Sequence, residues 1–268
     1  MCQLIVKPIG AELPEDKYLK NSYEANTDGM GIGFYKQGDK GVTIFKGFKK
    51  YKTFKKFIKK YLTKEHLILF HFRMATAGKT DGGNTHPFPI SSSIKELRAL
   101  QGTYPYIVGH NGVFSHYSGH EKLSDTQKFI SNVLTSPNIY KNLDDPSIQA
   151  LLNGYLLGSK IAVLSGEGRY WLFGQFIEDN GVFYSNPCYN QSYFNMNVVT
   201  PTQSGVTRME YDMPGYSYAN SSQFCDVCLQ EDFSYNMTDV SKDSDIYQAY
   251  ICDRCLLVSK RGYKRHAP

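Results

Sequence analysis

The pattern of apolar and polar residues divides the first two thirds of the chain into strands and helices. Short apolar runs bounded by Gly, Pro, Asn and Asp residues are typical of strands. Seven such runs predict strands over 30–35, 42–46, 67–72, 106–108, 160–164, 169–173 and 181–184. Helical periodicity predicts three helices, which lie between these strands in the sequence.

The first predicted helix is amphipathic and rich in lysine. Apolar side chains recur at helical spacing on one face, at Phe54, Phe57, Ile58, Tyr61 and Leu62. The opposite face carries Lys55, Lys56, Lys59 and Lys60. A basic amphipathic helix can contact a membrane or a nucleic acid. We favour the alternative, in which the apolar face packs on the core and the lysines are hydrated.

The other two helices are predicted from their start signals. Ser124 and Gln127 have the spacing of a capping box. Asp145 is placed as the N-cap of the third helix, with Pro146 at its first position, and this helix runs towards Gly158. Helices in the middle of the chain with strands on both sides favour an α+β fold, in which sheets stack and helices pack on them.

Composition narrows the class of protein. The 268 residues are 41% hydrophobic and 14% aromatic, which is sufficient for a sizeable core. The sequence has no apolar run of about 18 residues, so no transmembrane helix is expected. Lys7 and Pro8 interrupt the first apolar stretch, which therefore does not resemble a signal peptide. We expect a cytoplasmic protein, and its net charge of +5 does not require a nucleic-acid partner.

Four of the six cysteines form two C-x2-C pairs near the end of the chain, namely Cys225, Cys228, Cys252 and Cys255. In a reducing compartment such pairs favour metal binding over disulfides. Four thiolates make a closed tetrahedral zinc site, which predicts structural Zn2+. Sequence character changes near residue 213, so we expect a domain over 2–213 and a zinc-binding module over 214–268. Its basic tail, 260–266, fits either nucleic-acid contact or a solvated terminus.

Cys2 is the strongest candidate for chemistry. It follows Met1 directly, and cysteine is small enough for removal of the initiator methionine. A terminal cysteine has a thiol of pKa about 8.5 next to an α-amino group of pKa about 8. This pairs a nucleophile with its own base, as in amide-cleaving enzymes that use the chain terminus.

Three downstream segments carry groups that fit amide chemistry. Arg73 ends an apolar strand and presents a fork suited to a carboxylate. Asn111 and Gly112 follow the strand predicted over 106–108 and together can form an oxyanion hole. Asp125 stands at a helix start and can meet a substrate ammonium group. Each segment taken alone is also an ordinary turn or cap.

Taken together, these residues resemble the class II glutamine amidotransferases, a family of N-terminal-nucleophile hydrolases. The resemblance covers roughly residues 2–200. It rests on Cys2, the glycine-rich loop 28–33, the Arg-x-Ala-Thr-x-Gly box 73–78, the His-Pro pair 86–87, the His-Asn-Gly segment 110–112 and the Ser-Asp-Thr segment 124–126. Two positions depart from the pattern: residues 26–27 are Asn-Thr instead of Arg-Gly, and residue 77 is Ala instead of His.

The resemblance implies a four-layer αββα sandwich and a glutaminase reaction. Cys2 would attack the side-chain amide of glutamine, and the oxyanion donors would be Asn111 and Gly112. The resemblance also implies substrate-binding roles for Arg73, Thr76, His86 and Asp125. No cofactor is expected for catalysis. Only about 55 residues follow the predicted boundary, so a separate synthase partner is expected to consume the ammonia, unless it is simply released.

A second hypothesis comes from a different class. The fold can serve as a catalytically inactive binding module that contacts protein or nucleic acid through the zinc finger and the basic tail. The presence of all the proposed site residues in one chain favours the enzyme, because an inactive fold does not require them.

Overall fold

The computed structural model describes residues 2–74, 81–114, 117, 123–156 and 158–190, together with the backbone of four short strands farther along. The chain divides into two units, 1–200 and 201–268, and each is described by itself. The predicted boundary near residue 213 lies outside the described residues. None of the helices in the described part of the chain is long and apolar enough to cross a membrane.

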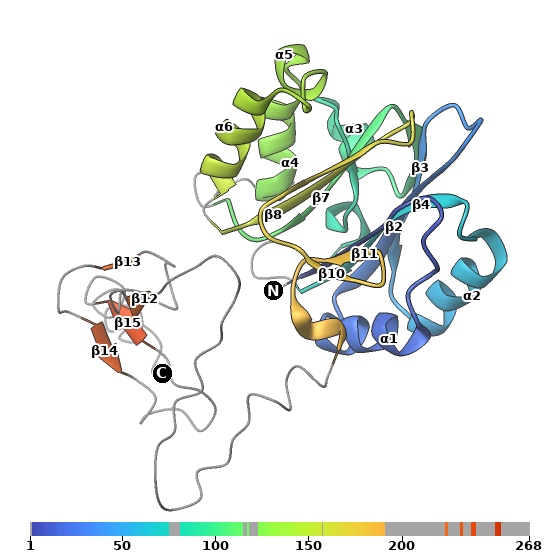
Figure 1. The fold of residues 1–268 in the computed structure, drawn as a ribbon, viewed down its shortest axis with the longest axis horizontal. Coiled ribbons are helices and arrows are strands. Elements are labelled where there is room, and N and C mark those ends of the chain that lie inside the picture. The colour runs from blue at the N-terminus through green and yellow to red at the C-terminus, as the bar shows by residue number, and fades with distance from the viewer. Residues whose placement is uncertain are drawn as a thin grey trace, which may run out of the picture. The chain divides into compact units, whose positions relative to one another are not determined.

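The first unit is built on two antiparallel sheets (Figure 1). The larger sheet has the order β10-β11-β1-β4-β2-β3-β6. Its strands in chain order are β1 (Gln3–Lys7), β2 (Gly29–Lys36), β3 (Val42–Phe48), β4 (His66–Arg73), β6 (Gln101–Tyr104), β10 (Ile177–Asp179) and β11 (Val182–Tyr184). The smaller sheet has the order β5-β7-β8-β9. It contains β5 (Phe88–Pro89), β7 (Tyr106–Asn111), β8 (Lys160–Ser165) and β9 (Tyr170–Phe173).

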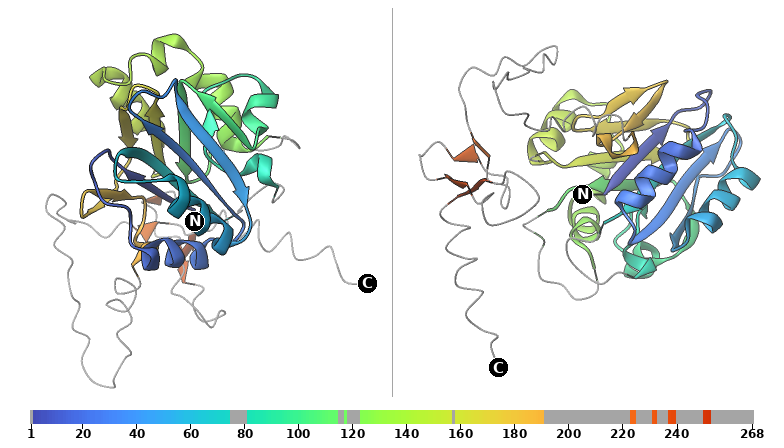
Figure 2. Two further views of the ribbon diagram at one scale, coloured as in Figure 1. Left: turned by 90° about the vertical axis from the view of Figure 1, so that its right-hand side faces the viewer. Right: turned by 90° about the horizontal axis from the view of Figure 1, so that it is seen from below.

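The helices flank these strands on two sides. Figure 1 shows α1 and α2 on one side of the first unit and α4, α5 and α6 on the other. Their bounds are α1 (Asp16–Ala25), α2 (Tyr51–Tyr61), α3 (Ile94–Arg98), α4 (Asp125–Phe129), α5 (Pro137–Tyr140) and α6 (Pro146–Leu156). A π-helical turn, η3 (Ile130–Leu134), continues α4, and two short 3-10 helices are η1 (Gly82–Asn84) and η4 (Pro187–Tyr189). In Figure 2, α1 and α2 lie side by side along the larger sheet.

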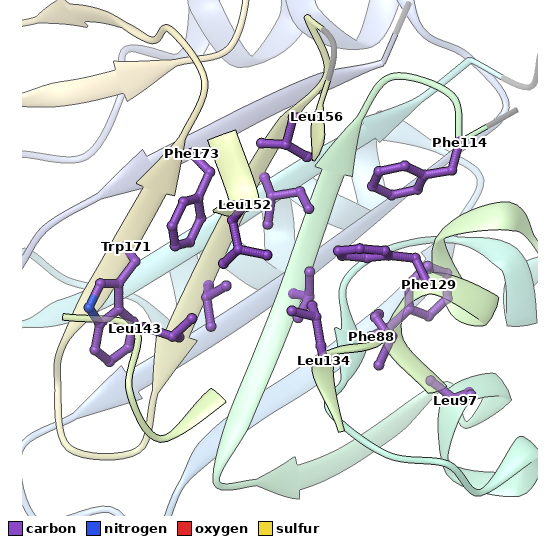
Figure 3. Packing of buried hydrophobic residues seen from close by; sticks show 14 residues of the cluster. Phe88, Leu97, Phe114, Phe129, Leu134, Leu143, Leu152, Leu156, Trp171 and Phe173 are labelled. Atoms are coloured by element: carbon purple, nitrogen blue, oxygen red, sulfur yellow. The ribbon is translucent and has the colours of Figure 1, made fainter. Parts of the chain in front are cut away.

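Three hydrophobic clusters connect the sheets and the helices. One joins the larger sheet to α1 and α2, for example Ile32 and Phe70 to Leu19 and Phe54. A second lies between the two sheets and contains residues of β1, β3, β4, β7 and β8. The third joins the smaller sheet to α4, η3 and α6, and Figure 3 shows its aromatic and leucine side chains in contact. The first unit is therefore a mixed α/β domain with antiparallel sheets.

Two glycines of β2 leave room for the chain segment that precedes β5. A Cβ atom on Gly31 would lie 1.8 Å from the carbonyl oxygen of His86. A Cβ atom on Gly33 would lie 2.0 Å from Ile107 and 3.2 Å from the ring of Pro87. Real Cβ atoms do not approach that closely, so the alternating glycines of β2 let the 86–87 segment pack against the sheet.

The sequence predictions for the regular elements are largely confirmed. All seven predicted strands are present, and α2, α4 and α6 fall where helices were expected. The capping box of α4 is formed. The Ser124 hydroxyl accepts the backbone N–H of Gln127, and the Gln127 side chain accepts the backbone N–H of Ser124. Asp145 caps α6, because its Oδ1 accepts the backbone N–H of Ser147 at 2.7 Å.

Two expectations were wrong in detail. The strand predicted over 106–108 continues through Asn111, so the proposed oxyanion donor is the last residue of β7 and not part of a following turn. The apolar stripe of α2 is only partly buried: Phe54 and Ile58 are buried, while Tyr61 is 50% exposed. Of the predicted lysine face, Lys56, Lys59 and Lys60 are exposed, whereas Lys55 is half-buried and forms an ion pair with Asp16 at 2.6 Å.

In the second unit the structure describes two pairs of short antiparallel strands. These are β12 (Gln223–Phe224) with β13 (Glu231–Asp232), and β14 (Met237–Asp239) with β15 (Tyr250–Cys252). Cys252 ends β15 and pairs with Met237 through the backbone.

Candidate active site

Cys2 lies immediately before β1, beside the end of β4. Because β1 and β4 are antiparallel, with Gln3 opposite Phe72, the start of one strand meets the end of the other. The Sγ atom of Cys2 lies 3.4 Å from both the backbone nitrogen and the carbonyl oxygen of Met74. Met74 directly follows Arg73, so the sheet register places the candidate nucleophile next to the candidate carboxylate ligand.

Burial and two charged residues influence the pKa of the Cys2 thiol. Burial raises the pKa of the Cys2 thiol, while the positive charge of Arg73 lowers this pKa and the negative charge of Asp125 raises it. A thiol with a raised pKa is protonated at neutral pH and needs a base before it can attack. The structure thus brings Cys2, Arg73 and Asp125 close enough for their charges to interact.

Asn111 is connected to the strand of the nucleophile through one hydroxyl group. Its Nδ2 atom donates to Ser185 Oγ at 3.0 Å, and the same oxygen accepts the backbone N–H of Leu4 at 2.9 Å. Asn111 is 4% exposed, and its Oδ1 atom has no hydrogen-bond partner among the described residues. An amide nitrogen carries two protons, and the bond to Ser185 uses one of them.

Gly112 occupies a position that only glycine fits. Its φ angle of +149° lies in the region that L-residues with side chains avoid. A Cβ atom would also lie 2.0 Å from Oγ of Ser159, the residue that precedes β8. Gly112 therefore packs directly against Ser159 at the end of β7.

Asp125 is fixed by a backbone bond to the segment that follows Gly112. Its Oδ2 atom accepts the N–H of Phe114 at 2.7 Å. Asp125 is also the first residue of α4, which Ser124 caps. The neighbouring Thr126 hydroxyl lies 2.8 Å from Nδ1 of the buried His110. The other carboxylate oxygen, Oδ1, lies 3.5 Å from the Thr126 hydroxyl, so these two contacts leave part of the hydrogen-bonding capacity of Asp125 unused.

Three buried histidines, His71, His86 and His110, pack near one another. The rings of His71 and His86 are 4.2 Å apart, and His71 Nε2 lies 3.2 Å from the carbonyl oxygen of His110. Both ring nitrogens of His86 are buried and have no hydrogen-bond partner among the described residues. Burial lowers the pKa of His71 to about 3, that of His110 to about 4, and that of His86 well below its usual range. All three imidazoles are therefore neutral at physiological pH.

A buried lysine borders the same cluster. Lys46 Nζ donates to the carbonyl oxygen of Leu97 at 2.9 Å and lies 4.2 Å from the ring centre of Phe88. The pKa of Lys46 is lowered to about 7, mainly by burial and also by the positive charge of Arg98, while the negative charge of Asp81 opposes this shift. Lys46 was not among the residues that the sequence indicated, because an isolated lysine in a strand gives no signal of burial.

The other predicted site residues are placed as follows. His86 is buried against His71 and Phe88. Thr76 lies outside the described residues. So do Cys225, Cys228 and Cys255, while Cys252 is described only by its backbone. Within the described residues no group of three or more His, Cys, Asp or Glu side chains could hold a metal ion.

Ser185 and Asn186 contact the candidate site but did not emerge from the sequence. They follow β11, and their side chains bond to Asn111 and to the backbone of residues 2–4. The one available signal was a pair of small polar residues directly after a predicted strand and before Pro187, which is also a common loop sequence.

Comparison with known families agrees with the geometry. Residues 18–130 match the family model of class-II glutamine amidotransferases. The matched segment is less than half of the chain, and it contains Arg73, Asn111, Gly112 and Asp125. It begins after Cys2 and ends before Ser185 and Asn186. No curated protein matches the chain.

Proposed function

We propose that this protein hydrolyses the side-chain amide of glutamine to glutamate and ammonia, with Cys2 as an N-terminal nucleophile. The observation that carries the proposal is the connection of Cys2 to the segment of Arg73 and to Asn111, the residue before Gly112, with Asp125 close enough to influence the charge of the thiol. Cys2 Sγ lies 3.4 Å from the residue after Arg73, and Asn111 is joined to the strand of Cys2 through Ser185. The match of residues 18–130 to class-II glutamine amidotransferases supports the same reaction.

The reaction begins once Met1 has been removed. The free α-amino group of Cys2 takes the thiol proton, and the sulfur attacks the amide carbon of glutamine. The negative charge that develops on the amide oxygen is stabilised by the side-chain N–H of Asn111 and the backbone N–H of Gly112. The amide nitrogen leaves as ammonia with the proton held by the α-amino group. Water then cleaves the γ-glutamyl thioester, which releases glutamate and restores the thiol.

Two charged residues give the site its preference for an amino-acid head group. Arg73 binds the α-carboxylate of glutamine, and its guanidinium is suited to a bidentate contact. Asp125 binds the α-ammonium group with the capacity that its bonds to Phe114 and Thr126 leave unused. His86 and Thr76 line the pocket. An amide without both charged groups would lose one or both contacts, so simple amides are expected to be poor substrates.

The rest of the molecule is proposed to serve this reaction. The first unit is a four-layer αββα sandwich, a proposal supported by the three hydrophobic clusters that join helices, sheet, sheet and helices in turn. The four cysteines after residue 213 hold a structural zinc ion, and this module belongs to a cytoplasmic enzyme. The ammonia is passed to a separate synthase or acceptor enzyme.

The test measures intact mass and glutaminase activity on the same sample. The protein is purified, loss of Met1 is confirmed by mass, and glutamate release from glutamine is measured with and without 6-diazo-5-oxo-norleucine. We expect glutamate release and a single covalent adduct. Cys2→Ala should abolish both, whereas Cys188→Ala, which removes the other cysteine of the first unit, should keep the adduct.

Two results would contradict the proposal. One is a protein with a free Cys2 terminus that neither releases glutamate nor forms the adduct, even with added candidate synthases. The other is an adduct that persists in Cys2→Ala. The first result would favour the inactive binding module, whose contacts with protein or nucleic acid would survive Cys2→Ala and disappear when residues after 213 are deleted.

A further inference from the structure

The segment 185–188 holds the first residues of the described chain in place. Ser185 N donates to the carbonyl oxygen of Leu4 at 3.0 Å, and its hydroxyl accepts the N–H of the same residue at 2.9 Å. Asn186 Nδ2 donates to the carbonyl oxygen of Cys2 at 2.8 Å. Residues near a chain end are poorly ordered unless they are tied down. Here Cys2 and Leu4 are both bonded to the same short segment.

Gln3 completes this connection with its side chain. Gln3 is fully buried, and its Nε2 donates to the carbonyl oxygen of Asn186 at 3.1 Å. Its Oε1 atom lies 3.4 Å from both Ser185 Oγ and Cys188 Sγ. Because the carboxamide is bonded at both ends, residues 2–4 cannot shift along β11 without breaking several buried hydrogen bonds, each of which is costly to leave unmade.

Ser185 also reaches the smaller sheet. A hydroxyl group offers one proton and two lone pairs. Ser185 Oγ uses all three, since it accepts from Leu4 N and Asn111 Nδ2 and donates to Gln3 Oε1. Ser185 is completely buried, so water does not compete for these bonds. One oxygen atom therefore connects the strand that carries the nucleophile with the residue that donates to the oxyanion.

We propose that Ser185 and Asn186 are positioning residues, which fix the oxyanion donor Asn111 relative to Cys2. Ser185 occupies one N–H of Asn111 and thereby directs the other towards the substrate, and Asn186 fixes the backbone of Cys2 itself. The inference rests on the proposed function. Both residues lie beyond the segment that matches the family model, so their role follows from the contacts in this chain.

The test compares two buried serines. In Ser185→Ala the oxyanion donor loses its anchor, so kcat should fall roughly 10- to 100-fold with little change in KM, as expected when a catalytic group is displaced by about 1 Å. The rate of inactivation by 6-diazo-5-oxo-norleucine should fall in parallel. Ser165→Ala is the matched control. Ser165 is 1% exposed and its hydroxyl accepts the backbone N–H of Glu167 and of Arg169, in the turn between β8 and β9. This control should lower the thermal midpoint to a similar extent but leave kcat unchanged.

A second variant covers the case in which Ser185→Ala does not fold. Asn186→Asp keeps the size of the side chain and an oxygen for the N–H of Cys188, but replaces the donor to Cys2 with a carboxylate oxygen. It should lower kcat, and the added negative charge should move the pH profile of inactivation to higher pH. The inference is overturned if the folded variants keep kcat within about twofold of wild type, or if Ser165→Ala loses as much kcat as they do. An inactive wild-type protein would instead refute the proposed function.

Discussion

The space between the two sheets has an apolar half and a polar half, built from the same strands. Along β4, Leu67 and Leu69 belong to the cluster between the sheets, while His71 and Arg73 continue the same face. All four side chains are buried. The difference is in their partners: the leucines are surrounded by apolar side chains, whereas His71 Nε2 lies 3.2 Å from a carbonyl oxygen of β7.

Strand β7 repeats the same division. Ile107 packs in the apolar half, and Asn111 ends the strand with its side chain bonded to Ser185. Between them, Gly109 leaves no room for a side chain, since a Cβ atom would lie 2.7 Å from Leu4. The comparison indicates that the apolar half and the polar half of the space between the sheets serve different functions. The apolar half fixes the distance and register of the sheets, and the polar half uses that rigidity to hold charged and amide groups that would cost stability elsewhere.

The sharpest test of this division is a truncation in the apolar half. Leu69→Ala removes buried methyl groups from the contact between the sheets and should lower the free energy of unfolding by about 2–5 kcal/mol. Glutaminase activity per folded molecule should stay within about twofold of wild type at a temperature where the variant remains folded. Urea denaturation and steady-state kinetics measure the two quantities.

The matched control for this prediction is Leu151→Ala. Leu151 is 70% exposed on α6, so the same chemical change should alter the free energy of unfolding by less than about 0.5 kcal/mol. If Leu69→Ala costs no more than Leu151→Ala, the apolar half does not stabilise the domain. If it reduces kcat as strongly as Ser185→Ala, the two halves do not have separate tasks.

The polar half should make the domain sensitive to acid. An unfolded histidine binds a proton near pH 6.5, whereas burial holds the pKa of His71 in the folded state at about 3. Above pH 6.5 both states are neutral and this residue has no effect. Below pH 6.5 the unfolded state binds more protons, so the free energy of unfolding falls, by about 2 kcal/mol for this one residue between pH 7 and pH 5.

The variant His71→Gln measures this contribution. Glutamine keeps an N–H for the carbonyl oxygen of His110 and cannot be protonated in this range. The loss of unfolding free energy from pH 7 to pH 5, followed by urea denaturation, should be smaller by about 2 kcal/mol in the variant. Equal pH dependence in the two proteins would mean that His71 takes up its proton in the folded state as readily as in the unfolded one.

The sequence was most informative where signals are local. The capping box of Ser124 and Gln127 and the N-cap Asp145 were recognised because cap and helix lie within a few residues of each other. The candidate site residues Arg73, Asn111 and Asp125 were found through motifs whose order resembles a known family. Arg73 and Asp125 influence the charge of the Cys2 thiol, and Asn111 bonds to Ser185.

Features that depend on distant contacts were not predicted. Helix α1 was not recognised, because its buried residues, Leu19 and Ser22, form no continuous apolar stripe. The contact of Ser185 with Leu4 joins residues 181 positions apart, and no pattern in either segment indicates it. Polar residues buried by tertiary contacts resemble loop residues in the sequence, so the segment that holds Cys2 became apparent only from the structure.

The last prediction concerns Lys46, a cation at the border of the polar half. Burial lowers its pKa from 10.5 to about 7 in the folded state. Below pH 7 the lysine is charged in both states, and above pH 10.5 it is neutral in both. Between these values the unfolded state binds more protons, so the free energy of unfolding should rise with pH, by at most about 1.4 kcal/mol per unit.

Lys46→Met should remove this rise and stabilise the domain by about 1–2 kcal/mol at pH 7, because no charge is then buried. The carbonyl oxygens of Gly83 and Leu97, to which Lys46 donates, keep a second donor in Gln127 Nε2 at 3.2 and 3.1 Å. Lys56→Met, on the exposed face of α2, makes the same chemical change without burial and should leave stability and its pH dependence nearly unchanged. Urea denaturation between pH 7 and pH 9 compares the three proteins. A wild-type curve that is flat, or a Lys46→Met variant less stable than Lys56→Met, would show that the polar half holds this cation without cost, and the contrast between the two halves would then be confined to the histidines.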